Sequence, residues 1–305
     1  MKGSSLTFSA NQGLHALCKR CLYFNPIRET RQAWSQQGIS MIFAGIDCGT
    51  KSTKTVIYMN NQIIGSGAAA TGFNQQEAVA RSLEEALCNA GVTRDQITKT
   101  GSTGSGRKAV GMADIMVNDI MAIARGGRYY FNNAGTVIDI GAEDVKVVRI
   151  DNDGAIMDFT INEKCAAGAG AFIETIARAL ETPVSEMGPL SLKSGKRIPI
   201  NAQCVVFAES EVIGLIHAKT ARHDIIRAVH DALASRIASL VFRIGLQEDI
   251  VITGGVGKNQ GVADSMKREL NLRKIYVPER PECGAATGAA IMASESTLKT
   301  IPKAL

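Results

Sequence analysis

The chain has 305 residues, of which 45% are hydrophobic and 21% charged, with 30 glycines, and this is a globular composition long enough for two domains. The formal net charge of +5 is mild, so we expect no nucleic-acid partner and no membrane surface, and no apolar run approaches the ~18 residues that span a bilayer. The seven cysteines are odd in number and scattered, which predicts no disulfide framework and favours a reducing, cytoplasmic location.

Residues 1–40 show no sustained hydrophobic period, and we expect them to be a disordered or leader-like extension. From Met41 the pattern alternates between short apolar runs and helical spacing, with Gly91 as a helix stop. The predicted strands are 42–47, 54–59, 62–70 and 98–103, and the predicted helices are 75–90 and 114–126.

The strand-and-turn pattern that begins at Met41 recurs about 90 residues later. There Asp139-Ile-Gly141 has the same Asp-x-Gly form as Asp47-Cys-Gly49, again at the end of a predicted strand. In each copy the pattern predicts a strand, a tight turn and a second strand, followed by helices. We therefore predict two similar α/β domains, 41–134 and 135–305, that face each other across a cleft. In the second domain we predict a helix from about 169, a loop at 189–199, helices at 205–217, 224–245, 260–270 and 284–294, and strands at 250–253 and 274–277.

The small-residue turns are suited to phosphate, because backbone N–H groups and hydroxyls can approach its oxygens without side-chain obstruction. Two aspartates, Asp47 and Asp139, would converge from opposite domains and hold Mg²⁺ through water. Lys51 or Lys54 could offset phosphate charge. A further glycine turn at 254–255 follows a third strand. Together these turns predict a nucleotide cleft.

Two cysteines, Cys165 and Cys204, each precede a predicted helix. The first turn of a helix offers unpaired N–H groups and the positive end of the macrodipole, which favour a bound anion such as a thiolate-ligated iron–sulfur cluster. Such a cluster needs four thiolates and one chain offers two, so the simplest complete site is shared by two copies of the chain. The alternative is that both cysteines are small buried hydrophobes.

Three segments, 44–54, 137–146 and 251–259, resemble the first phosphate, second phosphate and adenosine motifs of the actin-like (RNase H-like) ATPases, a superfamily that includes sugar kinases and heat-shock seventy chaperones. With the cysteine segments 164–170 and 204–211 added, residues 41–294 resemble the ATP-dependent activators of 2-hydroxyacyl-CoA dehydratases and the ATPase subunits of benzoyl-CoA reductase.

The resemblance implies that ATP hydrolysis drives a low-potential electron into a dehydratase or reductase partner, with an electron donor such as ferredoxin or flavodoxin. It implies one [4Fe–4S] cluster per dimer, held by Cys165 and Cys204 of two identical or related subunits, and a last helix near the adenine pocket. It implies contacts with ATP or ADP from the residues Gly49, Thr50, Lys51, Ser52, Thr53, Lys54, Gly104, Gly141, Ala142, Gly254, Gly255, Val256 and Asn259.

Four acids, Asp47, Asp139, Asp119 and Glu143, are the candidate catalytic residues, and Asp119 falls where the family has an acid. The second phosphate motif of the family commonly reads Gly-Gly-Gln-Asp, whereas this chain has Gly141-Ala-Glu-Asp144. A carboxylate at Glu143 replaces a neutral, water-orienting amide near phosphate.

The main alternative is a small-molecule, sugar-type kinase of the same fold, in which Asp119 or Asp139 would be the base for a substrate hydroxyl. A kinase has no use for the two cysteines at helix starts. A second alternative is a nucleotide-dependent scaffold that binds ATP without turnover or iron.

Overall fold

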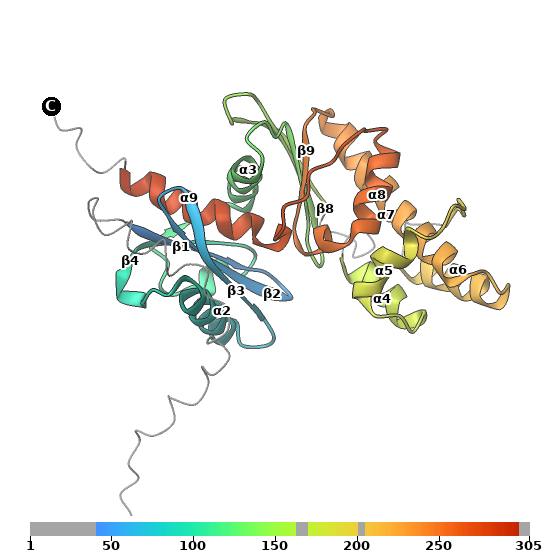
Figure 1. Cartoon of the computed structure of the whole chain (residues 1–305), viewed down its shortest axis with the longest axis horizontal. Coiled ribbons are helices and arrows are strands. Elements are labelled where there is room, and N and C mark those ends of the chain that lie inside the picture. Colours follow the sequence, from blue (N-terminus) through green and yellow to red (C-terminus); the bar gives the residue numbers. More distant parts are fainter. Residues whose placement is uncertain (1–40, 163–169, 201–204, 299–305) are drawn as a thin grey trace, which may run out of the picture. The chain divides into compact units, whose positions relative to one another are not determined.

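The computed structural model describes residues 41–162, 170–200 and 205–298 (Figure 1). The predictions made for residues 1–40, for Cys165 and for Cys204 lie outside these ranges.

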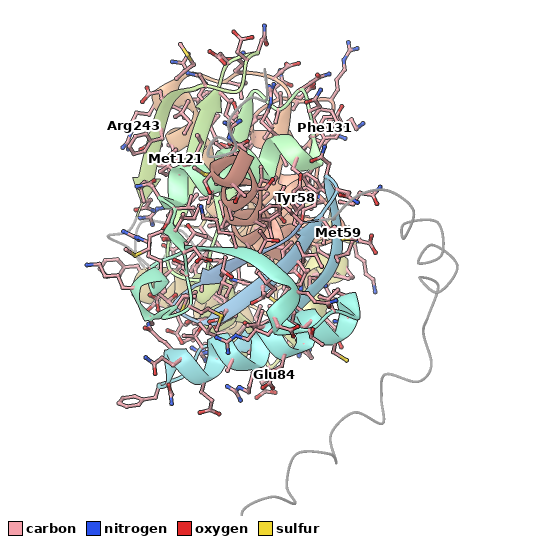
Figure 2. The ribbon with its side chains drawn as sticks, turned by 90° about the vertical axis from the view of Figure 1, so that its left-hand side faces the viewer. Tyr58, Met59, Glu84, Met121, Phe131 and Arg243 are labelled. Atoms are coloured by element: carbon pink, nitrogen blue, oxygen red, sulfur yellow. The ribbon has the colours of Figure 1, made fainter. Side chains whose placement is uncertain are left out.

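The first sheet has the strand order β3-β2-β1-β4-β5 (Figure 1). β1 pairs with β2 in antiparallel and with β4 in parallel register. Helix α2 packs on this sheet with Asn74 as its N-cap, Gly91 as its left-handed C-cap, and Glu84 on its exposed face (Figure 2). The elements are β1 (Ile42–Cys48), β2 (Ser52–Met59), β3 (Gln62–Ala70), α2 (Gln75–Ala90), β4 (Ile97–Thr103) and β5 (Ile115–Met116).

The second sheet repeats this arrangement with the order β8-β7-β6-β9. β6 pairs with β7 in antiparallel and with β9 in parallel register, as β1 does with β2 and β4. Its strands are β6 (Thr136–Ile140), β7 (Val145–Ile150), β8 (Ile156–Asn162) and β9 (Ile250–Thr253). The predicted fold class, two similar α/β halves, is therefore confirmed.

Two glycines occupy equivalent positions in the two halves and show how similar the backbones of the halves are. Gly104 follows β4 with φ +88°, and Gly254 follows β9 with φ +86°. A Cβ at Gly104 would lie 2.5 Å from Asp47 Oδ1 and 2.6 Å from a backbone oxygen of β1; one at Gly254 would lie 2.3 Å from a backbone oxygen of β6. Both positions therefore require glycine for its backbone conformation and for its lack of a side chain.

The second half carries a layer of helices beside its sheet (Figure 1). The central helix of this layer is α7, which packs against α5 and α8. The main core lies here, and its largest fully buried side chains include Phe172 of α4, Met187 of α5 and Leu233 of α7. The helices are α4 (Gly170–Ala179), α5 (Val184–Ser191), α6 (Val205–His217), α7 (Arg222–Ile244) and α8 (Gln260–Glu269).

Two helices are exchanged between the halves. Helix α3 (Asp119–Tyr130) follows the first sheet but packs against the strands of the second, and helix α9 (Gly284–Leu298) follows the second sheet but packs on β1, β4 and β2. Tyr58 of β2 lies in one apolar cluster with Ala290 and Ala293 of α9 (Figure 2). A division of the chain at 134/135 places each helix with the half that precedes it in sequence, whereas each packs on the sheet of the other half.

The two exchanged helices also cross each other closely. A Cβ at Gly288 of α9 would lie 1.8 Å from the Ala122 carbonyl oxygen, and one at Gly126 of α3 would lie 2.0 Å from the Gly284 carbonyl oxygen. The contact therefore brings backbone against backbone.

Three element predictions differ from the structure. The helix predicted from residue 114 begins at Asp119, because residues 115–116 pair with β4 as β5 and Asn118 caps the helix. The predicted loop at 189–199 begins inside α5, which contains Pro189. The predicted strand at 274–277 is a single bridge at Tyr276, since Pro278 has no N–H with which to continue the ladder.

Candidate nucleotide-binding site

A cleft of about 690 Å³ lies where the carboxyl ends of β1 and β6 meet, and both halves line it. Of the predicted nucleotide-contacting residues, twelve line the cleft: Gly49, Thr50, Lys51, Ser52, Lys54, Gly104, Gly141, Ala142, Gly254, Gly255, Val256 and Asn259. Thr53 does not. It is fully buried, and its hydroxyl lies 3.0 Å from that of Thr71, because alternate residues of β2 face opposite sides of the sheet.

Each half brings an aspartate and a lysine to the cleft from the two strands of its hairpin. Asp47 of β1 is the register partner of Lys54 in β2, and Asp139 of β6 is the register partner of Lys146 in β7. Lys54 Nζ lies 3.3 Å from Asp47 Oδ2. The side chains of both lysines are mostly buried, at 14% and 13% exposure. Two cations and two carboxylates therefore face the same space.

Burial and neighbouring charges shift the pKa values of these groups. Desolvation raises the pKa of Asp139 to about 6; Lys146 opposes this shift and Asp47 adds to it. Burial acts to lower the pKa of Lys54, but the carboxylates of Asp47 and Asp139 outweigh it and raise that pKa. Burial likewise acts to lower the pKa of Lys146, and Asp144 and Asp139 outweigh it. Both lysines therefore stay charged at neutral pH, while Asp139 can release or accept a proton near neutrality.

The two turns at the strand ends close in the same way. The Gly49 N–H donates to the Ser52 carbonyl oxygen over 3.2 Å, and the Gly141 N–H donates to the Asp144 carbonyl oxygen over 2.9 Å. In the second turn Glu143 is exposed and does not line the cleft, whereas the next residue, Asp144, does and forms an ion pair with Lys146. The acid that this turn brings to the cleft is thus Asp144, and Glu143 lies outside the cleft lining.

The fourth predicted acid, Asp119, lines the cleft from the first turn of α3. Its Oδ1 accepts hydrogen bonds from the Thr103 hydroxyl at 3.2 Å and the Gly104 N–H at 3.1 Å, and Arg107 lies 3.6 Å away. Its Oδ2 lies 3.8 Å from Lys146 Nζ. Asp119 therefore joins the loop after β4 to the hairpin of the other half.

On the opposite wall, Asn259 holds the start of α8. Its Oδ1 accepts hydrogen bonds from the N–H groups of Gly261 and Val262, and its Nδ2 lies 3.1 Å from Nε2 of the buried His230. Both ends of the amide are thus used within the protein. The side chain therefore positions the 254–259 turn, and one N–H of its Nδ2 remains beyond the bond to His230.

Sequence reasoning missed Lys146 as a site residue. The available signal was the repeat itself, since Lys146 follows Asp139 at the same spacing as Lys54 follows Asp47.

The cleft residues Glu174, Lys258 and Glu282 were also missed. Lys258 lies inside the predicted 251–259 motif, whereas no local pattern marks Glu174 or Glu282. Lys258 Nζ lies 2.9 Å from Glu282 Oε1. Burial acts to raise the pKa of Glu282, but its hydrogen bond with Lys258 contributes to a net lowering. This pair joins the 254–259 turn to the segment that leads into α9.

Within the described ranges, no group of three metal-ligating side chains occurs and no helix is long and apolar enough to cross a membrane.

The comparison with known proteins decides between the members of this fold. Residues 44–293 match the sequence profile of the BadF/BadG/BcrA/BcrD ATPase family. The chain belongs to the BadF/BadG/BcrA/BcrD ATPase family. The predicted resemblance to dehydratase activators and benzoyl-CoA reductase ATPase subunits is thereby confirmed.

Family relatives match over most of the chain. The 2-hydroxyisocaproyl-CoA dehydratase activator of Clostridioides difficile is 38% identical over 253 residues, which are 83% of this chain and 95% of the relative. Its structure, with bound ADPNP, has a TM-score of 0.80 at 36% identity and covers 87% of this chain and 100% of that one. Component A of the Acidaminococcus fermentans (R)-2-hydroxyglutaryl-CoA dehydratase has a TM-score of 0.82 at 37% identity, covering 85% and 100% of the two chains.

Proposed function

We propose that this protein is an ATP-hydrolysing iron–sulfur electron-transfer component that delivers a low-potential electron to a 2-hydroxyacyl-CoA dehydratase or a benzoyl-CoA reductase-type partner. The observation that carries the nucleotide part is the convergence of two equivalent aspartate–lysine pairs, one from each half, on a single cleft. The relative solved with ADPNP supports the same assignment.

The cleft has the charges that a magnesium–nucleotide complex needs. Lys54 and Lys146 offset phosphate charge, and the small residues of the turns let backbone N–H groups approach phosphate oxygens. Asp47 and Asp144 offer hard oxygen ligands for Mg²⁺ or for its water shell. Asp139, with a pKa of about 6, can accept a proton from an attacking water near neutral pH.

The elements around the two cysteines fit a shared cluster. Helix α4 begins at Gly170, shortly after Cys165, and helix α6 begins at Val205, the residue after Cys204. The two helices pack against each other. A helix N-terminus favours a bound anion, and thiolates are the usual ligands of iron–sulfur clusters. When bound, the cluster would supply the one-electron chemistry.

Helix α6 also has exposed apolar side chains that a second copy of the chain would cover in part. Its large apolar side chains Phe207, Ile213 and Ile216 are 61%, 45% and 42% exposed. Covering exposed large apolar side chains removes apolar area from water and favours association. A homodimer or a pair of related subunits would cover them.

The kinase alternative finds less support. Asp119, one of its two candidate bases, already has Thr103, Gly104 and Arg107 as partners at one of its oxygens. Asp139 would serve as base in either function, so the support for the activator comes from the family match.

Anaerobic purification, with iron and sulfide counted per dimer, tests the proposal. We expect a brown dimer with about four iron atoms, the number in a tetrathiolate cubane. Cys165→Ala should remove the iron while nucleotide affinity stays unchanged, because the two sites use different segments. Cys88→Ala, on the exposed side of α2, is the matched control and should keep its iron. A colourless, iron-free protein that phosphorylates sugars would refute the proposal.

A further inference from the structure

Glu174 of α4 reaches across the cleft and forms an ion pair with Lys51 of the first turn. The side chain of Lys51 is 42% exposed and that of Glu174 is 37% exposed, and both residues line the cleft. The pair is therefore accessible to a ligand, and it joins the two halves at the phosphate turns.

Helix α4 is also attached to the second turn. The N–H of Gly170 donates to the Gly141 carbonyl oxygen over 2.9 Å, and the N–H of Ala171 donates to the Ala142 carbonyl oxygen over 2.8 Å. A Cβ at Gly170 would lie 3.1 Å from Val256 Cγ2, so the helix start fits closely against the 254–259 turn as well. These contacts fix the position of α4, and Glu174 is thereby presented to Lys51.

We propose that Glu174 tunes nucleotide affinity by competing with the phosphate groups of the nucleotide for Lys51. The inference rests on the nucleotide part of the proposed function. Without nucleotide the Glu174 carboxylate neutralises the Lys51 ammonium. A phosphate that takes this ammonium breaks the ion pair and leaves Glu174 facing an anion. The cost grows with the negative charge on the ligand, so Glu174 disfavours ATP more than ADP.

The alternative role for Glu174 predicts the opposite sign. If the carboxylate held Lys51 in the position that phosphate needs, or bound Mg²⁺ itself, its removal would weaken binding. The direction of the effect therefore distinguishes the two roles.

Titration calorimetry with ADPNP and with ADP, in the presence of Mg²⁺, measures this directly. We expect Glu174→Gln to tighten binding by about two- to fivefold for ADPNP and by less for ADP, the size that an exposed ion pair supplies. The gain should shrink as the salt concentration rises. Glu181→Gln removes one negative charge from an exposed position near the end of the same helix and should leave both affinities unchanged.

A double-mutant cycle shows whether the effect acts through Lys51. Lys51→Gln alone should weaken binding, and in that background Glu174→Gln should gain less than in the wild type, because no ion pair remains to be broken. Thermal unfolding without nucleotide checks that each variant is folded. Equal gains in both backgrounds, or weaker binding by Glu174→Gln, would overturn the inference.

The outcomes also separate this inference from the proposed function. If the wild-type protein binds neither nucleotide, both fail. If it binds nucleotide but Glu174→Gln binds no tighter, only the role of Glu174 fails. If it binds nucleotide but holds no iron, the electron-transfer function fails and the role of Glu174 is unaffected.

Discussion

Replacing His230 by glutamine should change how the stability of the protein depends on pH. His230 of α7 is fully buried, and its Nε2 lies 3.1 Å from Nδ2 of Asn259. An amide nitrogen can only donate, so Nε2 is the acceptor and the ring proton is on Nδ1. Burial lowers the pKa of His230 from an ordinary 6.5 to about 4, which keeps the imidazole neutral at physiological pH.

The size and sign of the effect follow from linkage. Between pH 6.5 and 4 the unfolded chain binds a proton at this histidine and the folded protein does not, so stability falls as the pH falls. With these two pKa values, lowering the pH from 8 to 5 removes about 2 kcal/mol of folding free energy at this one site. Asp139 acts in the opposite direction: its folded pKa of about 6 exceeds the ordinary 3.8, so it stabilises the fold as the pH falls.

Comparing variants separates the contribution of His230 to the pH dependence of stability from that of opposing groups such as Asp139. His230→Gln keeps a hydrogen-bond acceptor for Asn259 but does not titrate, and His217→Gln, at an exposed position, is the matched control. Urea unfolding at pH 8, 6.5 and 5, without nucleotide, gives the free energy of unfolding of each protein. The wild type should lose about 2 kcal/mol relative to His230→Gln between pH 8 and 5. Parallel curves for these two proteins would refute the assignment of a buried, neutral imidazole.

Three further changes test the crossing of α3 with α9 and the cleft. Gly288→Ala places a Cβ 1.8 Å from a backbone carbonyl oxygen of α3 and should destabilise the fold by about 1–3 kcal/mol in urea unfolding, whereas Gly111→Ala, with nothing within 4 Å, should be neutral. Asp139→Asn should lower the ATPase rate at least about a hundredfold and remove the rise of the rate near pH 6; a retained rise would exclude Asp139 as the titrating group. Asp144→Asn should weaken Mg²⁺-dependent nucleotide binding and Glu143→Gln should not, and calorimetry would contradict this if the two variants behaved alike.

The repeated strand–turn–strand arrangement could be predicted from the sequence because the signals for it are local. The strand ends at Asp47 and Asp139, each followed by a small-residue turn, recur in the same order, and the structure brings both to one cleft. A turn whose backbone must come close to phosphate accepts only small residues at the positions of approach, so it can be recognised in the sequence. For that reason most of the predicted cleft residues line the cleft.

The exchange of α3 and α9 could not be predicted in the same way. Helical periodicity shows which face of a helix is apolar, and it contains no information on which sheet covers that face. The glycines that permit the crossing, such as Gly126 and Gly288, look like ordinary small residues in an Ala/Gly-rich sequence. The position of Glu174 opposite Lys51 was equally hidden, because it depends on how two separate segments meet.

The turns after β1 and β6 have the same backbone hydrogen bond but side chains of opposite charge. This difference supports distinct roles for the two halves. At equivalent positions the first turn has Lys51 and Ser52, whereas the second has Glu143 and Asp144. A turn that brings an ammonium and a hydroxyl to the cleft suits phosphate oxygens, and a turn that brings the Asp144 carboxylate to it suits a hydrated cation. If the halves were interchangeable, exchanging the two turns would preserve nucleotide binding. We expect instead that the exchange abolishes it, because the Lys51 ammonium would be lost from the first turn and a carboxylate would face phosphate there beside Glu174.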